Sequence, residues 1–157
     1  MTSQQSASSQ LDLYVNAEVA APVSLAEWQQ WFEDWLEAMQ VLGSSELSVI
    51  LTNDERMQTL NHRYRDRNTP TDVLAFAAQE ASIPGHSEET PLVLGDIVIS
   101  VPTAQRQAEE QQHSLSEELA WLASHGLLHL LGWDHPNEDS LQLMLQKQRD
   151  LLKYTRE

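Results

Sequence analysis

The stretch His125-Gly-Leu-Leu-His129-Leu-Leu-Gly132-Trp-Asp134-His135 holds three of the six histidines of this 157-residue chain. The first two histidines lie on a run with helical periodicity, where a spacing of four residues places both imidazoles on the same side. Gly132 predicts the end of that helix, because glycine readily takes the left-handed conformation found at helix ends. A turn at Gly132 brings His135 back toward the first pair.

Three imidazoles in this arrangement predict a metal site. Two ligands from one helical face and a third after the turn occupy three corners of a tetrahedron, which leaves the fourth corner open, as in catalytic zinc sites. Leucines surround His125 and His129, and unpaired imidazoles buried among apolar side chains cost free energy unless something bonds them. The alternative is a cluster of buried polar rings with a structural role.

Gly126 occupies the position at which zinc proteases of the H-E-x-x-H type carry the glutamate that acts as general base. Its presence argues against ordinary peptide hydrolysis. Glycine inside a helix costs about 1 kcal/mol relative to alanine. We therefore expect another backbone or the substrate to approach closely at Gly126.

The length of the chain fits one domain, with residues 1–10 expected to be a disordered tail and residues 11–157 the domain itself. The absence of cysteine excludes disulfides and thiolate ligands and suits a reducing compartment. The polar N-terminal segment lacks the features of a signal peptide, and no apolar run approaches transmembrane length. We expect a soluble, cytoplasmic protein that does not associate with membranes.

The formal net charge of −15, taken alone, argues against a nucleic-acid partner. The distribution of charge modifies this conclusion, because four of the nine basic side chains lie close together at Arg56, Arg63, Arg65 and Arg67. The sequence therefore predicts an acidic body with a local arginine patch, and the acidic stretches are interpreted as solvated faces.

Hydrophobic periodicity predicts the order of helices and strands. Strands are expected at 11–15, 46–52, 72–77 and 92–101, and helices at 25–42, 53–65, 102–113, 115–131 and 137–154, with loops at 66–70 and 79–91. Trp28, Trp31 and Trp35 share one helical face, which favours a core stripe over a binding surface. This order predicts an α+β fold in which a small mixed β-sheet is covered by helices and the metal-binding helix packs on the sheet.

Three separate segments resemble the YbeY family of metal-dependent endoribonucleases. Residues 60–76, Leu-Asn-His-Arg-Tyr-Arg followed by Thr-Pro-Thr-Asp-Val-Leu-Ala-Phe, are similar to the arginine-bearing signature of that family. Residues 94–100 are similar to its central strand, and residues 125–135 to its metal motif. The chain has Arg-Asn-Thr at 67–69 where the family often has Lys-Asp-Lys, and Ala-Phe-Ala at 75–77 where Ser-Phe-Pro is common.

The resemblance implies a bacterial, single-strand-specific endoribonuclease that acts in ribosomal RNA maturation, particularly at the 3′ end of the small-subunit RNA, and in ribosome quality control. It implies one Zn²⁺ held by His125, His129 and His135, and a functionally important arginine at Arg65. The expected partners are single-stranded or ribosomal RNA and the ribosome or its proteins, with no DNA. Histidine sites also accept other divalent transition metals.

The chemistry of these residue types agrees with that implication. Zinc on three neutral imidazoles can lower the pKa of bound water to roughly 7 and polarise a phosphoryl oxygen. Arg65 matches the charge of a phosphate with a bidentate fork, which lysine cannot do. Arg63 and Arg67 are expected to make secondary RNA contacts, although the three arginines share one side only if the segment is extended.

No general base is evident from the sequence. Asp134 could orient a ligand histidine through its second ring nitrogen, or it could be a turn residue. Asp96 is a candidate base, or a strand-end carboxylate that bonds to backbone. The 2′-hydroxyl of RNA is another possible nucleophile, in place of water.

Two other functions remain open at the level of sequence. One is a metal-dependent hydrolase of another substrate class. The other is a non-catalytic, zinc-stabilised ribosome-assembly factor whose acidic body docks on basic ribosomal proteins.

Overall fold

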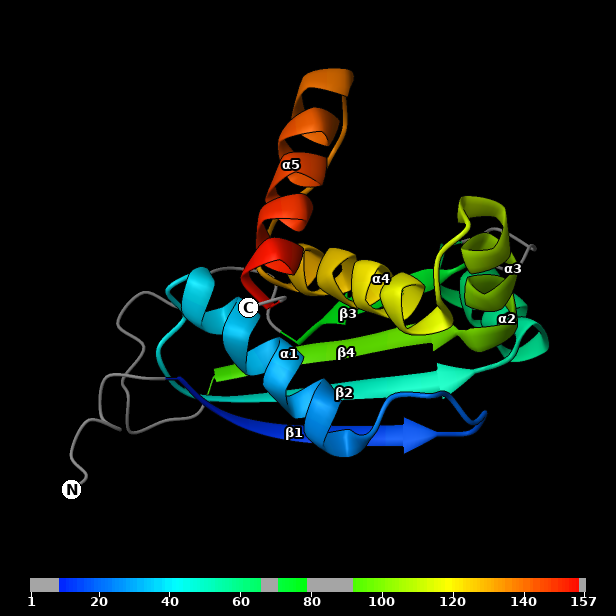
Figure 1. Ribbon diagram of the computed structural model, residues 1–157, viewed down its shortest axis with the longest axis horizontal. Helices are drawn as coiled ribbons and strands as arrows, with labels where there is room; N and C mark the ends of the chain where they lie inside the picture. Colours follow the sequence, from blue (N-terminus) through cyan, green and yellow to red (C-terminus); the bar gives the residue numbers. More distant parts are fainter. Residues whose placement is uncertain (1–8, 66–70, 79–91, 156–157) are drawn as a thin grey trace.

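The computed structural model describes residues 9–65, 71–78 and 92–155. In these ranges a sheet lies beneath a layer of helices (Figure 1). The strands are β1 (Ser9–Ala17), β2 (Gly43–Thr52), β3 (Val73–Ala77) and β4 (Leu92–Ser100), and the helices are α1 (Leu25–Ala38), α2 (Asp54–Arg65), α3 (Val101–Gln111), α4 (Leu115–Leu130) and α5 (Glu138–Thr155).

The sheet has the strand order β1-β2-β4-β3. The first three strands in this order run parallel to one another, and β3 runs antiparallel to β4. The predicted mixed sheet covered by helices is therefore confirmed. Within the described residues β3 is an edge strand. Side chains from helices on either face of the sheet can therefore meet beside it.

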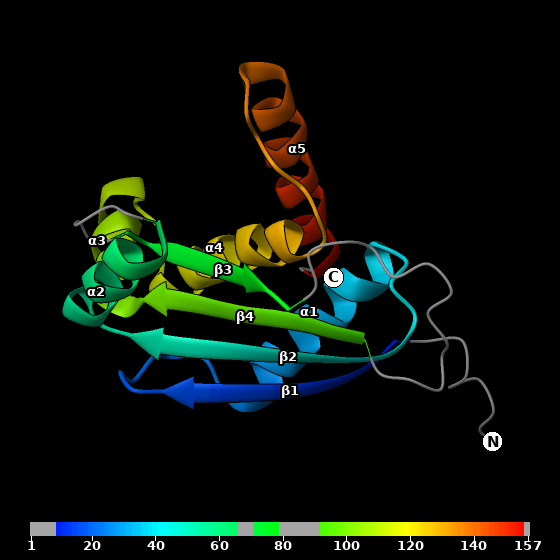
Figure 2. The same ribbon diagram turned by 180° about the vertical axis from the view of Figure 1, so that it is seen from behind.

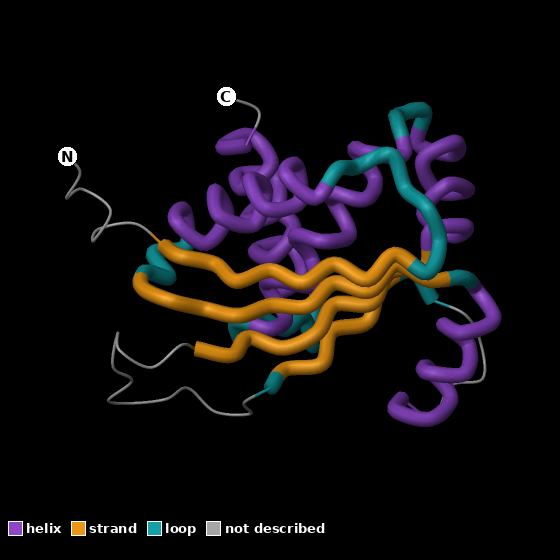
Figure 3. The backbone as a smooth tube through the Cα atoms, turned by 90° about the horizontal axis from the view of Figure 1, so that it is seen from below, coloured by secondary structure: helices purple, strands orange, loops and turns teal. Residues whose placement is uncertain are grey.

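The two faces of the sheet carry two separate hydrophobic clusters. Ile97 and Ile99 of β4 belong to the large core beneath α1, α4 and α5, whereas Val98 packs with Met57 of α2 and Leu74 of β3. This alternation follows from the pleat of a strand, in which successive side chains point to opposite faces. Figure 3 shows most of the helices on one side of the sheet, and Figure 2 shows α2 on the other side.

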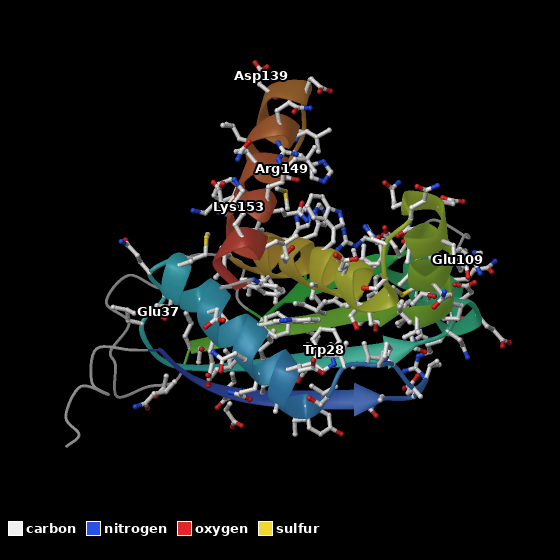
Figure 4. All side chains as sticks on the ribbon, viewed as in Figure 1. Trp28, Glu37, Glu109, Asp139, Arg149 and Lys153 are labelled. Carbon is white, nitrogen blue, oxygen red and sulfur yellow. The ribbon has the colours of Figure 1, made fainter. Side chains whose placement is uncertain are left out.

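Helix α1 begins with a capping box, in which Ser24 and Glu27 satisfy each other's backbone amides. Trp28 and Trp35 are 1% and 0% exposed, so the tryptophan stripe is part of the core, as predicted. Trp31 is half-buried at the margin of the same cluster. Figure 4 labels Trp28, which lies in the layer between α1 and the sheet.

Helix α4 packs closely against the sheet because Gly126 faces β4. A Cβ atom at Gly126 would lie 2.9 Å from Cγ2 of Ile97, which is fully buried. The close approach predicted at this glycine is therefore confirmed, and the partner that the structure shows is the side chain of Ile97. The same contact sets the distance between the sheet and α4, the helix that carries His125 and His129.

The element boundaries differ slightly from the sequence-based prediction. Strand β1 begins at Ser9, two residues before the predicted strand, because residues 9 and 10 pair with Gly43 and Ser44 of β2. The rest of the predicted tail and the predicted loops 66–70 and 79–91 lie outside the described residues. Within the described ranges, no helix combines the length and apolar character needed to cross a membrane.

Candidate metal centre

Helix α4 ends one turn after His125 and directly after His129, at Leu130. Gly132 has a φ of 100°, its N–H donates to the His129 carbonyl at 3.0 Å, and the Trp133 N–H donates to the Leu128 carbonyl at 2.9 Å. This pair of bonds is a Schellman motif, which reverses the chain direction at a helix end. The structure thus contains the turn that the sequence predicts at Gly132.

The turn brings the three predicted ligands together. One ring nitrogen of each of His125, His129 and His135 lies within 4.8 Å of the others, and Nε2 of His125 is 3.1 Å from Nε2 of His129. Ligand nitrogens around a tetrahedral zinc ion are separated by about 3.3 Å, given Zn–N bonds of about 2.0–2.1 Å. The donor set and its spacing therefore fit one such ion, with a corner left open.

The histidine rings are oriented by partners outside the centre. Nδ1 of His125 is bonded to Oε1 of Gln148 on α5 at 3.0 Å, and His129 makes a hydrogen bond with the backbone of Trp133. Sequence reasoning missed Gln148, which lies 23 residues from His125. The sequence does hold one sign of a buried polar role. Gln148 shares a helical face with the apolar residues Met144 and Leu151.

The pKa of the His129 imidazole is lowered from its usual value near 6.5. The largest cause is burial, followed by the proximity of His125 and His135, since each effect disfavours a further positive charge. His129 is therefore neutral at neutral pH, which is the state that a metal ligand requires.

Asp134 lies in the turn between the second and third histidines. Its Oδ1 accepts a hydrogen bond from the backbone N–H of His135 at 2.8 Å, as a turn residue would. Its charge also acts on His129, whose pKa it shifts upward. The carboxylate thus supports the loop that carries His135.

Arg65 and two of the histidines line the same pocket, which has a volume of about 270 Å³. Arg65 is the last residue of α2, and its Nη2 donates to the carbonyl oxygen of Ala75 on β3 at 3.0 Å. The guanidinium also lies 5.9 Å from the centre of the Phe76 ring. The described lining of the pocket consists of Arg65, Val73, Leu74, Ala75, Ala77, His125, Gly126 and His129.

Residues 14–156 match the family model described as Endoribonuclease YbeY. The chain belongs to the YbeY family. It is 58% identical over 144 residues to the endoribonuclease YbeY of Synechococcus sp. (strain JA-2-3B'a(2-13)), with 90% of this chain and 88% of that protein covered. It is 55% identical over 140 residues to the endoribonuclease YbeY of Trichormus variabilis, which covers 85% and 80% of the two chains.

The fold also has a counterpart among solved structures. The solution structure of TM1509 from Thermotoga maritima superposes with a TM-score of 0.64 at 25% sequence identity. The match covers 92% of this chain and 89% of that one. The arrangement of sheet and helices described above is therefore shared with that solved structure.

Two departures from the common family pattern fall in the pocket itself. Ala75 and Ala77 take the places at which the family often has serine and proline, and both line the pocket beside Arg65 and the histidines. The wall formed by β3 is consequently apolar at these two positions. At positions 75 and 77 this wall therefore offers backbone polar groups and no side-chain hydroxyl.

Two of the predicted site residues, Asp96 and Arg63, lie away from the metal centre. Asp96 lies on the same face of β4 as Val98, because alternate residues of a strand share a face, and it pairs with Phe76 of β3. Ile97 lies on the other face, toward α4. Asp96 therefore lies on the opposite face of the sheet from the histidines, and it does not belong to the described lining of the pocket.

Arg63 is helical, like Arg65, so the two side chains diverge. Its guanidinium lies 6.0 Å from the centre of the neighbouring Tyr64 ring, and Arg63 does not belong to the described lining of the pocket. Arg67 lies outside the described residues. Of the two predicted arginines that the structure describes, Arg65 is the one that lies in the same pocket as the histidines.

Proposed function

We propose that the protein is a zinc-dependent endoribonuclease that cuts single-stranded RNA and acts in the maturation of ribosomal RNA, at the 3′ end of the small-subunit RNA, and in ribosome quality control. The observation that carries the proposal is the pocket shared by Arg65, His125 and His129. Membership of the YbeY endoribonuclease family supports it. The predicted cytoplasmic location belongs to the same proposal.

The histidines and Arg65 have different roles in the cleavage of a phosphodiester. Zinc, when bound to the three histidines, supplies Lewis-acid chemistry for a phosphoryl oxygen and for an attacking hydroxyl. Arg65 binds the nonbridging oxygens, on which negative charge develops in the transition state. Its bond to the Ala75 carbonyl holds the guanidinium at the pocket, so little reorganisation is needed when substrate enters.

Single-stranded RNA suits this pocket better than a duplex. The positive charge that attracts phosphate is concentrated at Arg65 and the metal centre, while the chain as a whole carries a net charge of −15. A flexible strand can bend one phosphate into a recess between β3 and α4, whereas a duplex holds its phosphates on a stiff cylinder. Arg63 and Arg67 are proposed as secondary contacts for the strand.

The nucleophile is either water or the 2′-hydroxyl of the substrate. No carboxylate belongs to the described lining of the pocket, so the lining itself offers no acidic general base. A substrate with one deoxyribose at the cleavage position separates the two routes. Loss of cleavage at that position, together with a cyclic phosphate on the normal product, identifies attack by the 2′-hydroxyl.

A second candidate function follows from the position of His135. This ligand lies in the segment between α4 and α5, so a metal ion would also tie the two helices together. A zinc-stabilised ribosome-assembly factor without catalytic activity would require the metal ion only for this structural link between α4 and α5. Hydrolysis of peptides is disfavoured, because Gly126 packs on Ile97 where a protease would carry its glutamate.

One set of assays separates these functions. Zinc-loaded protein is incubated with single-stranded RNA, the same sequence as a duplex, single-stranded DNA, casein and purified ribosomes. The same assays use Arg65→Ala, His129→Ala and, as a matched loss of one arginine outside the pocket, Arg63→Ala. The proposal expects cleavage of single-stranded RNA alone, which Arg65→Ala and His129→Ala abolish and Arg63→Ala weakens only a few-fold.

Two results would contradict the proposal, and each would favour a different function. Ribosome binding that persists in all variants, with no cleavage of any substrate, would favour the assembly factor. Cleavage of casein with intact RNA would favour a hydrolase of another class.

A further inference from the structure

Gln148 is a polar residue buried in the apolar face of α5. It is 0% exposed, as is Met144 one turn before it, and Leu151 on the same face is 1% exposed. Helix α5 rises from the sheet layer, with Asp139 at its far end and Arg149 and Lys153 nearer to α4 (Figure 4). A buried amide costs free energy unless its donors and acceptor are bonded, so the contacts of Gln148 call for explanation.

The amide of Gln148 contacts three groups of α4. Its Nε2 lies 3.1 Å from the carbonyl oxygen of Trp121 and 3.4 Å from Oγ of Ser124. Its Oε1 lies 3.0 Å from Nδ1 of His125. Oγ of Ser124 also donates to the Trp121 carbonyl, at 2.8 Å.

These contacts determine which way the amide faces. The Trp121 carbonyl can only accept hydrogen bonds, so it must face the NH₂ group, which donates. Oε1 is then directed at His125, and since Oε1 is only an acceptor, Nδ1 of His125 must carry a proton. A neutral imidazole with its proton on Nδ1 has a free lone pair on Nε2. Nε2 is the atom that faces His129 at 3.1 Å.

We propose that Gln148 is a positioning residue of the metal centre, which holds His125 in the form protonated at Nδ1 and directs its Nε2 lone pair toward the ion. The inference rests on the metal centre of the proposed function and adds a partner from α5 to it. Outer hydrogen bonds of this kind fix the ring and the tautomer of metal-binding histidines, and their loss typically weakens metal binding 10- to 100-fold.

The neutral amide suits this position better than a carboxylate. A glutamate at 148 would keep an acceptor for His125 but place its second oxygen against the Trp121 carbonyl, at a fully buried position where bulk solvent does not screen the repulsion. Glutamine instead satisfies Trp121 and His125 together. Its two ends also join α5 to the turn of α4 that carries the first ligand.

The first test measures the tautomer in metal-free protein. Long-range ¹H–¹⁵N correlation spectra, with His125 assigned by comparison with His125→Gln, distinguish a proton on Nδ1 from one on Nε2. The inference predicts the Nδ1-protonated form in the wild-type protein. The Nε2-protonated form would overturn it, and this result needs no variant at Gln148.

The second test measures zinc affinity by competition with a chromophoric chelator. Gln148→Met keeps the length of the side chain and removes its hydrogen bonds to Trp121, Ser124 and His125. Gln142→Met makes the same change of side chain at an exposed position of α5. The inference predicts a zinc Kd about 10- to 100-fold higher for Gln148→Met, a mixture of His125 tautomers, and wild-type values for Gln142→Met. Wild-type affinity and an unchanged tautomer in folded Gln148→Met would overturn it.

Gln148→Glu keeps the inference testable if Gln148→Met does not fold. This variant retains the acceptor for His125, so the Nδ1-protonated form is expected to persist, and its loss would contradict the assigned role. Failure of the proposed function has a different signature. A wild-type protein that binds no zinc but shows the Nδ1-protonated form would contradict the metal centre while leaving the contact with Gln148 intact.

Discussion

At the scale of single residues, the site depends on one guanidinium that two contacts of β3 hold in place. Arg65 is exposed on α2, yet it donates to the Ala75 carbonyl and lies over the Phe76 ring. Among the described residues this guanidinium has no other hydrogen-bond partner, so its remaining N–H groups can bond a phosphate in the pocket. A lysine has no planar fork with which to bond the strand and a phosphate at the same time.

We therefore expect Arg65→Lys to lower kcat/KM on single-stranded RNA by about tenfold to a hundredfold, because a charge-assisted hydrogen bond contributes about 1.5–3 kcal/mol. Steady-state cleavage assays measure the loss, and metal analysis should find unchanged zinc content. Arg63→Lys, on the same helix, serves as the control. Equal activity of Arg65→Lys and wild type would remove Arg65 from the site.

At the scale of elements, the contact between α4 and β4 sets the distance of α4 from the sheet. Gly126 lies against Ile97, whose Cγ2 atom is close to the backbone of β4 and cannot move aside easily. Alanine at 126 gains about 1 kcal/mol of helix propensity. Overpacking a filled core costs about 1–3 kcal/mol, so the steric effect should exceed this gain.

Gly126→Ala is expected to lower the free energy of unfolding by about 1 kcal/mol and to weaken zinc binding, as α4 shifts away from the sheet. In the Ile97→Ala background the same change should be neutral or stabilising, because the clashing atoms are gone. Urea unfolding of the four proteins completes the double-mutant cycle. Additive effects would show that the contact does not limit the packing of α4.

A second element-scale contact fixes the start of α2, the helix that ends at Arg65. Asp54 accepts hydrogen bonds from Ser100, Thr103 and Arg106 around the start of α3. These bonds lower the pKa of the Asp54 carboxyl from 3.8 to about 2, with Ser100 as the largest cause. A folded-state pKa below the unfolded value means that the ionised carboxylate stabilises the fold above about pH 4, and that this stabilisation is lost as the pH falls through about 2.

Asp54→Asn should therefore destabilise the protein at pH 7 by about 1 kcal/mol, a value discounted for solvent screening because the side chain is 31% exposed. The difference from wild type should shrink between pH 4 and pH 2. Urea unfolding at pH 7 and pH 3 measures it, with the neighbouring exposed Glu55→Gln as control. A difference that is the same at both pH values would contradict the assigned linkage.

At the scale of the whole molecule, sequence reasoning succeeded where the signal is local. Periodicity predicted the helices and the mixed sheet, and Gly132 predicted the turn that gathers the histidines. Sequence reasoning failed where the role of a residue depends on a contact with a residue far away in the sequence. The bond between Gln148 and His125 joins two helices, and the partner of Gly126 is an isoleucine 29 positions earlier. The face on which Asp96 lies is another such case, because it depends on how the pleat of β4 is placed relative to α4.

The charge distribution leads to a prediction about RNA binding. The acidic body leaves few side chains to neutralise phosphates, and among the described residues the arginine that lines the pocket is Arg65. For a single strand, the slope of log K against log salt is about −0.7 per neutralised phosphate. We expect a shallow slope of about −1 to −2, measured by fluorescence anisotropy with a 2′-O-methyl oligonucleotide. A slope steeper than about −4 would indicate an extended basic surface.

The most direct test of the central claim is single-turnover cleavage of single-stranded RNA before and after metal removal. Dialysis against a chelator is expected to abolish cleavage, and an equimolar addition of Zn²⁺ should restore it in the wild-type protein but not in His129→Ala. Circular dichroism of each sample checks that the fold is retained. Cleavage that survives both the chelator and His129→Ala would contradict a metal-dependent endoribonuclease built on these three histidines.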